Sequence, residues 1–155
     1  MANGSALTEF KQGIEFLRKG RAAEAFECLR HAAAANQENP YYVSFLGVSV
    51  ARAQRKIAVA IDLCERALAL KRNDAQLYLN LAEVYVSAGR REDAVDMLDR
   101  GLRNCGFDAR IKQLRGSLGT RSSRVLPFLD RGHFLNRSLG RLRHRVLANA
   151  QKHAS

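Results

Sequence analysis

Residues 73–102 read NDAQLYLNLAEVYVSAGRREDAVDMLDRGL, and this stretch decides the fold. In its first half Tyr78, Leu81 and Tyr85 recur at helical spacing, so they share one face of an amphipathic helix. Gly89 follows directly, and glycine ends helices because it readily takes a positive φ. The first half therefore predicts a helix that ends in a tight turn.

The second half of the stretch predicts a second helix that returns along the first. Ala94, Leu98 and Leu102 recur on one face of this segment. Small residues occur on both predicted helices, at Ala82 and Ala94, and they allow two antiparallel helices to approach closely. We expect Asn73 to be the N-cap of the first helix. The whole stretch thus predicts a helix-turn-helix pair.

A single pair of this kind cannot bury its apolar face alone, so further copies are expected beside it. The small residue of the second helix recurs at Ala25, Ala60 and Ala94, at separations of 35 and 34 residues. A copy opens at Pro40, and its turn around Arg55 lacks the usual glycine. Three matched units therefore cover about residues 6–103.

These units resemble the tetratricopeptide repeat, a helix-turn-helix of about 34 residues. The resemblance implies an all-α fold, an α-solenoid with the superhelix of that family, built from three helix-turn-helix repeats. A further helix over residues 108–118 resembles the helix that caps such arrays. We expect residues 6–118 to form the repeat array with its capping helix.

Residues 119–155 are predicted to be a basic C-terminal extension. Residues 1–109 hold 15 Lys and Arg against 14 Asp and Glu, whereas residues 110–155 hold 11 against one. An amphipathic helix is expected from about residue 131 to 150, with an apolar stripe of Leu135, Leu139, Leu142 and Val146. Its basic residues are Arg137, Arg141, Arg143 and Arg145.

The sequence gives little support for catalysis, and we predict that the protein is not an enzyme. Its four histidines lack the spacing of a metal site, and no glycine-rich phosphate loop is present. Three cysteines without close spacing favour reduced thiols over disulfides or a metal centre. No signal peptide or apolar run of about 18 residues is evident. We therefore expect a cytoplasmic protein with no metal and no cofactor.

The resemblance implies that the first helices line a concave groove, where family members hold a peptide or helix of a partner protein. The groove positions expected here are Leu7, Phe10, Ile14 and Leu17 in the first repeat; Tyr41, Ser44, Val48 and Ala51 in the second; and Gln76, Leu79, Glu83 and Val86 in the third. Family members that grip a terminal carboxylate have Lys, Asn and Arg where this chain has Phe10, Ile14 and Phe45. A mostly apolar groove instead suits an amphipathic helix or a hydrophobic segment.

The leading hypothesis is thus a scaffold or chaperone-like protein-binding module. The alternative is an accessory factor that binds nucleic acid or an anionic membrane through its C-terminal arginines. The apolar stripe of the C-terminal segment leaves three further arrangements open. It could mediate a homodimer, fold back into the groove, or dock on the last repeat.

Overall fold

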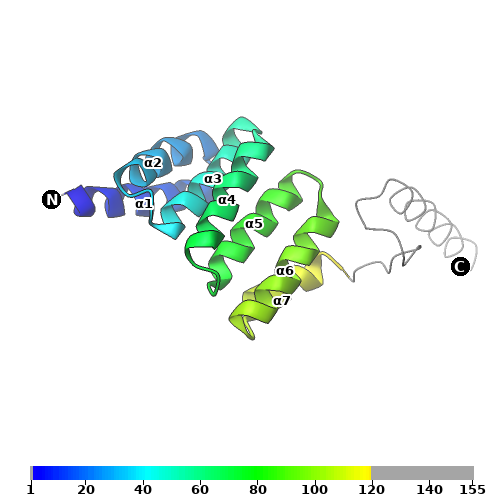
Figure 1. The fold of residues 1–155 in the computed structure, drawn as a ribbon. Coiled ribbons are helices and arrows are strands. Elements are labelled where there is room, and N and C mark those ends of the chain that lie inside the picture. Colours follow the sequence, from blue (N-terminus) through cyan, green and yellow to red (C-terminus); the bar gives the residue numbers. More distant parts are fainter. Residues whose placement is uncertain (1, 120–155) are drawn as a thin grey trace, which may run out of the picture. The chain divides into compact units, whose positions relative to one another are not determined.

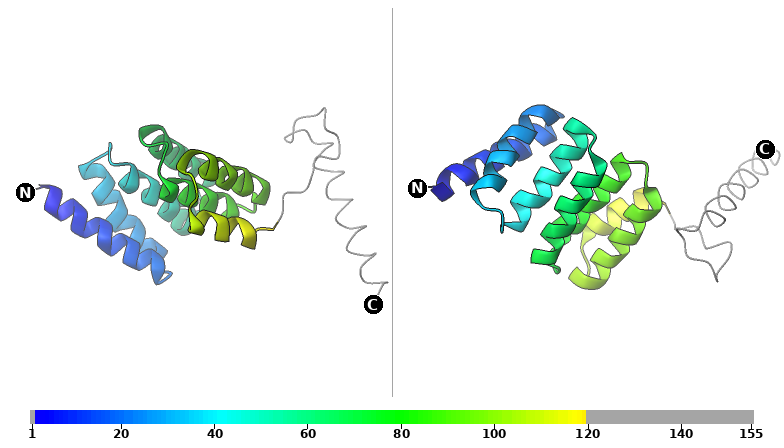
Figure 2. Two further views of the ribbon diagram at one scale, coloured as in Figure 1. Left: turned by 90° about the horizontal axis from the view of Figure 1, so that it is seen from below. Right: turned by 45° about the horizontal axis from the view of Figure 1, so that its top comes forward.

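The computed structural model describes residues 2–119, and the regular secondary structure of these residues is entirely helical. Figure 1 shows the helices arranged as successive pairs in chain order, and the views of Figure 2 show the same arrangement. The helices are α1 (Ala2–Arg18), α2 (Ala22–Ala35), α3 (Pro40–Gln54), α4 (Ile57–Leu70), α5 (Ala75–Ser87), α6 (Arg91–Cys105) and α7 (Ala109–Ser117). The predicted all-α repeat architecture is confirmed.

The predicted C-terminal helix, with Arg137, Arg141, Arg143 and Arg145, lies outside the described residues and stays a prediction. Among the helices that are described, none is both long and apolar enough to cross a membrane. Helix α1 begins earlier than the sequence pattern predicts, at Ala2 and not at Ala6.

Equivalent N-caps open three successive first helices. Asn39, Asp74 and Asp108 precede α3, α5 and α7, and each side chain accepts hydrogen bonds from backbone N–H groups of the first turn. The expectation that Asn73 caps α5 is wrong. Asp74 accepts from the N–H of Gln76 at 3.0 Å, and a carboxylate at this end also complements the helix dipole.

Asp74 also links two repeats. Its Oδ2 accepts a hydrogen bond from the Tyr41 hydroxyl at 2.5 Å, and Lys71 Nζ lies 2.9 Å from the same oxygen. Burial raises the pKa of Asp74, but the hydrogen bonds from Tyr41, Lys71 and Gln76 outweigh burial, so its pKa lies below the ordinary value of 3.8. The carboxylate is therefore stabilised in the folded state.

Replacing Asp74 with asparagine is expected to destabilise the domain in a pH-dependent way. Asparagine keeps the N-cap but removes the charge that faces Lys71. Because the folded pKa is depressed, the contribution of the carboxylate is present above the ordinary pKa and is lost as pH falls through the folded value. Urea unfolding should show a stability difference at pH 7 that shrinks toward pH 3. A difference that does not change with pH would contradict this account.

Left-handed residues end the first helix of each repeat. Gly20 and Gly89 have φ of 75° and 70°, and the sequence pattern predicts this conformation for Gly89. The turn that lacks glycine uses Arg55 with φ of 57°. A non-glycine residue in this region costs roughly 1–2 kcal/mol, so the second repeat carries local strain that the other two avoid.

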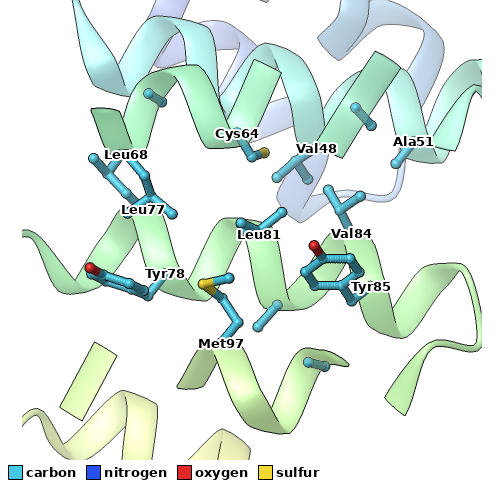
Figure 3. Packing of buried hydrophobic residues seen from close by; sticks show 14 of the residues in the cluster. Val48, Ala51, Cys64, Leu68, Leu77, Tyr78, Leu81, Val84, Tyr85 and Met97 are labelled. Atoms are coloured by element: carbon cyan, nitrogen blue, oxygen red, sulfur yellow. The ribbon is translucent and has the colours of Figure 1, made fainter. Parts of the chain in front are cut away.

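Small residues recur at three positions of each repeat and hold the helices close together. All nine are buried: Gly13, Gly47 and Ala82; Ala25, Ala60 and Ala94; and Ala32, Ala67 and Gly101. Large side chains fill the remaining space. In Figure 3, Leu81 and Val84 of α5 point toward α3 and α4, whereas Tyr78 lies on the opposite side of α5, near Met97 of α6. Helix α5 is thus packed on two sides.

Helix α7 contacts both α5 and α6, as the first helix of a fourth repeat would. Ile111 is fully buried against Gly101 and Tyr78. At the far end of α7, the Arg91 guanidinium of α6 donates to the carbonyl of Leu118. Helix α7 therefore covers the apolar side of the last repeat.

Candidate functional site

The first helices form one continuous side of the array, which we call the inner face. Helix α1 contacts α3, α3 contacts α5, and α5 contacts α7. By contrast, α2 and α4 do not contact each other in the described part of the chain, nor do α4 and α6. Since neighbouring repeats approach more closely through their first helices, the stack curves toward that side.

Aromatic side chains form the N-terminal end of the inner face. The ring of Phe10 lies 4.7 Å from that of Tyr42 and 5.5 Å from that of Phe45, the second in a T-shaped arrangement. Phe10, Phe45 and Ile14 are only partly buried, and Leu7 is 45% exposed. These residues leave apolar surface in contact with solvent beside a well-packed aromatic cluster.

Polar side chains form the middle of the inner face. Asn80 of α5 donates to the Ser44 hydroxyl of α3 at 2.9 Å, and Gln76 donates to Asn80 Oδ1 at 2.8 Å. Arg110 of α7 in turn donates to Gln76 Oε1 at 2.9 Å. Ser44 and Asn80 are buried, so their mutual hydrogen bond compensates for the loss of water. This chain of four side chains connects three first helices.

Arg52 provides a second connection between first helices, because it contacts both α1 and α5. From α3, its guanidinium donates to the carbonyl of Leu17 in α1 at 3.0 Å and lies 2.7 Å from Glu83 Oε1 in α5. The second contact is an ion pair without a well-aligned hydrogen bond. Because both side chains are more than a third exposed, the pair adds little stability. Its main consequence is that Arg52 is held against both neighbouring helices.

Of the twelve expected groove residues, the structure leaves eight at least partly exposed and buries four. Seven of the eight are Leu7, Phe10, Ile14, Tyr41, Gln76, Leu79 and Glu83. Three others are buried, namely Leu17, Ser44 and Val48, so in this structure they pack between helices. Of the two remaining positions, Ala51 is buried and Val86 is 40% exposed. The accessible lining is therefore apolar near α1 and a mixture of polar and apolar side chains near α5.

Sequence reasoning missed three residues of this face: Arg52, Asn80 and Arg110. Their register could have indicated them, since Arg52 follows Arg18 by 34 residues and Arg110 follows Gln76 by the same interval. Asn80 was also recognisable as a polar residue one helical turn after Gln76. Equivalent repeat positions place these side chains on the same side of the array.

The described residues offer little reactive chemistry. Burial raises the pKa of Cys64 to about 12, which keeps this thiol protonated and unreactive. Cys28 and Cys105 are free and half-buried, and burial raises the pKa of each. Within residues 2–119 no cluster of three or more His, Cys, Asp or Glu could hold a metal ion.

Comparison with known proteins defines the class of fold. Residues 51–118 match the family model described as Tetratricopeptide repeat. A comparison of the sequence with curated proteins gave no significant match. The resemblance to the tetratricopeptide repeat (TPR) family is thus confirmed over residues 51–118, and the described part of the chain has the TPR fold. This fold is typically a non-catalytic protein-interaction module.

Solved TPR domains share this fold at low sequence identity. The second TPR domain of human RPAP3, in complex with an HSP70 peptide, has 16% identity and a TM-score of 0.61, with coverage of 78% of this chain and 100% of that one. The TPR2B domain of yeast Sti1 in its Hsp70 complex has 21% identity and a TM-score of 0.60, with coverage of 74% and 95%.

A bacterial secretion chaperone is also similar. SycD of Yersinia enterocolitica, in complex with a peptide of the translocator YopD, has 12% identity and a TM-score of 0.57. The match covers 72% of this chain and 84% of that chain. At such identities the comparisons establish the fold alone.

Proposed function

We propose that this protein is a non-catalytic interaction module that binds a segment of a partner protein on its inner face. The observation that carries the proposal is the partly exposed apolar surface of Leu7, Phe10, Ile14 and Phe45. This surface lies on the same side as the hydrogen-bonding groups of α5 and α7. Apolar pockets beside a few polar groups are what recognition of an amphipathic helix or extended segment requires.

The similar structures support the proposal. The RPAP3 and SycD domains named above are each in complex with a peptide, and the Sti1 domain is in an Hsp70 complex. In the present chain Phe10, Ile14 and Phe45 replace the polar groups that grip a terminal carboxylate in some family members. We therefore expect the ligand to be held through side chains along its length and not through its C-terminus.

Charged substitutions on the inner face should abolish this binding. Peptides that bind the full-length chain are first selected from a random 16-residue phage-display library, and their affinities are measured by fluorescence anisotropy. The Leu7→Glu/Ile14→Glu variant should bind them at least about tenfold more weakly, a loss of about 1.4 kcal/mol or more, because charge is placed against apolar ligand side chains. A circular dichroism melt confirms that the variant is folded.

The control lies on α4. Val59 and Leu70 are 49% and 51% exposed, which is close to the exposure of Leu7. The Val59→Glu/Leu70→Glu variant should keep full affinity. If this control loses the selected peptides while the inner-face variant retains them, the inner face is not the binding site.

One observation supports the alternative function, which is binding of nucleic acid or an anionic membrane through the C-terminal segment. Residues 120–155 hold eight Lys and Arg against a single Asp, and such a segment favours phosphate-rich surfaces. A chain truncated after Gly119 tests it in the same assay format, with a DNA duplex and anionic vesicles as ligands. Binding that disappears on truncation and weakens steeply with salt would favour this function over the inner face.

A further inference from the structure

Four cationic side chains are placed along three helices of the inner face. Arg52 lies on it, since its guanidinium contacts Leu17 and Glu83 of the two neighbouring first helices. Arg110 lies on it through its hydrogen bond to Gln76. Arg18 occupies the position in α1 that Arg52 occupies in α3, just as Gly13 corresponds to Gly47.

Lys11 belongs to the same stripe. It precedes Arg18 by seven residues, which is two helical turns, and Ile14 lies between them at helical spacing. Lys11 and Arg18 are both exposed, and within the described residues Lys11 makes no ion pair. Of these four cations, Arg18 is paired with Glu15, Arg52 with Glu83 and Arg110 with Asp108.

Charge is segregated between the two sides of the array. The first helices α1, α3, α5 and α7 together contain six Lys and Arg against three Asp and Glu. The second helices α2, α4 and α6 contain five against eight. A net charge of +3 on one side and −3 on the other will orient a charged partner before contact is made.

We propose that the inner face binds an acidic amphipathic segment of a partner protein, whose side-chain carboxylates meet Lys11, Arg18, Arg52 and Arg110 while its apolar side chains meet Phe10, Ile14 and Phe45. This inference rests on the proposed function and gives the chemistry of the ligand. The carboxylates are those of Asp and Glu side chains, since apolar residues occupy the positions at which family members hold a terminal carboxylate.

Arg52 retains capacity for such a ligand, and Lys11 makes no ion pair within the described residues. Arg52 directs one N–H at the Leu17 carbonyl and approaches Glu83 with another terminal nitrogen, and a guanidinium has five N–H donors in all. Its side chain is 40% exposed. An incoming carboxylate can share the Arg52 guanidinium with Glu83 without breaking the hydrogen bond to α1. Arg52 therefore accepts a further negative charge while it keeps its contact with α1.

The test uses the same random 16-residue library, displayed so that no peptide has a free C-terminus. Selected peptides should be acidic and should carry hydrophobic residues at helical or alternating spacing. The Lys11→Glu/Arg18→Glu variant should bind them at least about tenfold more weakly. This loss should shrink between 0.05 M and 0.5 M salt, since exposed charges are screened.

The matched control reverses two exposed arginines of the second helices, Arg66→Glu/Arg100→Glu, and should leave the affinity unchanged. Basic or uncharged peptides that bind the inner face would overturn this inference and leave the proposed function standing. So would a peptide of residues 131–150 of this chain that bound there more tightly than the acidic peptides. Peptides that bind outside the inner face would instead overturn the proposed function.

Discussion

Replacing Leu81 with alanine is expected to lower the free energy of unfolding by about 2–5 kcal/mol. Leu81 is fully buried on α5, at the interface with α3 and α4. Small residues surround this interface, so the neighbouring helices are already in close contact. They therefore cannot move in to fill the cavity that the shorter alanine side chain leaves. Urea denaturation of the full-length chain at 25 °C, followed by circular dichroism, measures the effect.

Leu70→Ala is the control for this experiment. Leu70 is 51% exposed at the end of α4, so its replacement should cost less than about 1 kcal/mol. Because each repeat contacts only its neighbours, loss of the interface at α5 should also uncouple α1–α4 from the rest of the array. The Leu81→Ala transition should therefore be broader than that of the unmodified chain. Equal costs for the two leucines would contradict the packing described above.

The second large effect is expected at Gly47, whose replacement by alanine should cost about 1–3 kcal/mol. A Cβ at this position would lie 2.7 Å from Cys64 Sγ and 2.9 Å from the carbonyl oxygen of Ala60. The carbonyl belongs to the backbone of α4, so α3 and α4 must move apart. The same denaturation experiment measures the loss of stability.

Gly116→Ala is the matched control for Gly47. Gly116 is also helical, but a Cβ added there would meet nothing within 4 Å. The higher helix propensity of alanine should then raise stability by up to about 1 kcal/mol. Opposite signs at two helical glycines are the expected signature of close approach between α3 and α4. A similar gain at both positions would show that Gly47 is not required by packing.

Much of the fold was predictable because the role of a residue in one repeat indicates the role of the residue at the equivalent position in the next repeat. The column of Ala25, Ala60 and Ala94 predicted which residues lie between helices, and all three are fully buried. The N-cap of α5 was predicted one residue too early, at Asn73, because both Asn73 and Asp74 are good capping residues. The register with Asn39 and Asp108 distinguishes them in retrospect.

The candidate site was less predictable, because its character depends on contacts between repeats. Ser44 and Asn80 are 36 residues apart in the sequence, yet both are buried and a hydrogen bond joins their side chains. The guanidinium of Arg52 reaches the carbonyl of Leu17 over 35 residues. Periodicity places such residues on a face but does not reveal which side chains cover one another. The sequence therefore indicated a mostly apolar groove, whereas the accessible lining changes from apolar near α1 to mixed polar and apolar near α5.

The most direct test of the central proposal locates a bound peptide on the described domain. A display-selected peptide carrying a nitroxide label is added to the isotope-labelled full-length chain, and paramagnetic broadening is recorded for every assigned backbone amide. We predict strong broadening along α1, α3, α5 and α7, with the amides of α2, α4 and α6 much less affected. Broadening centred on α2, α4 and α6 would contradict the account.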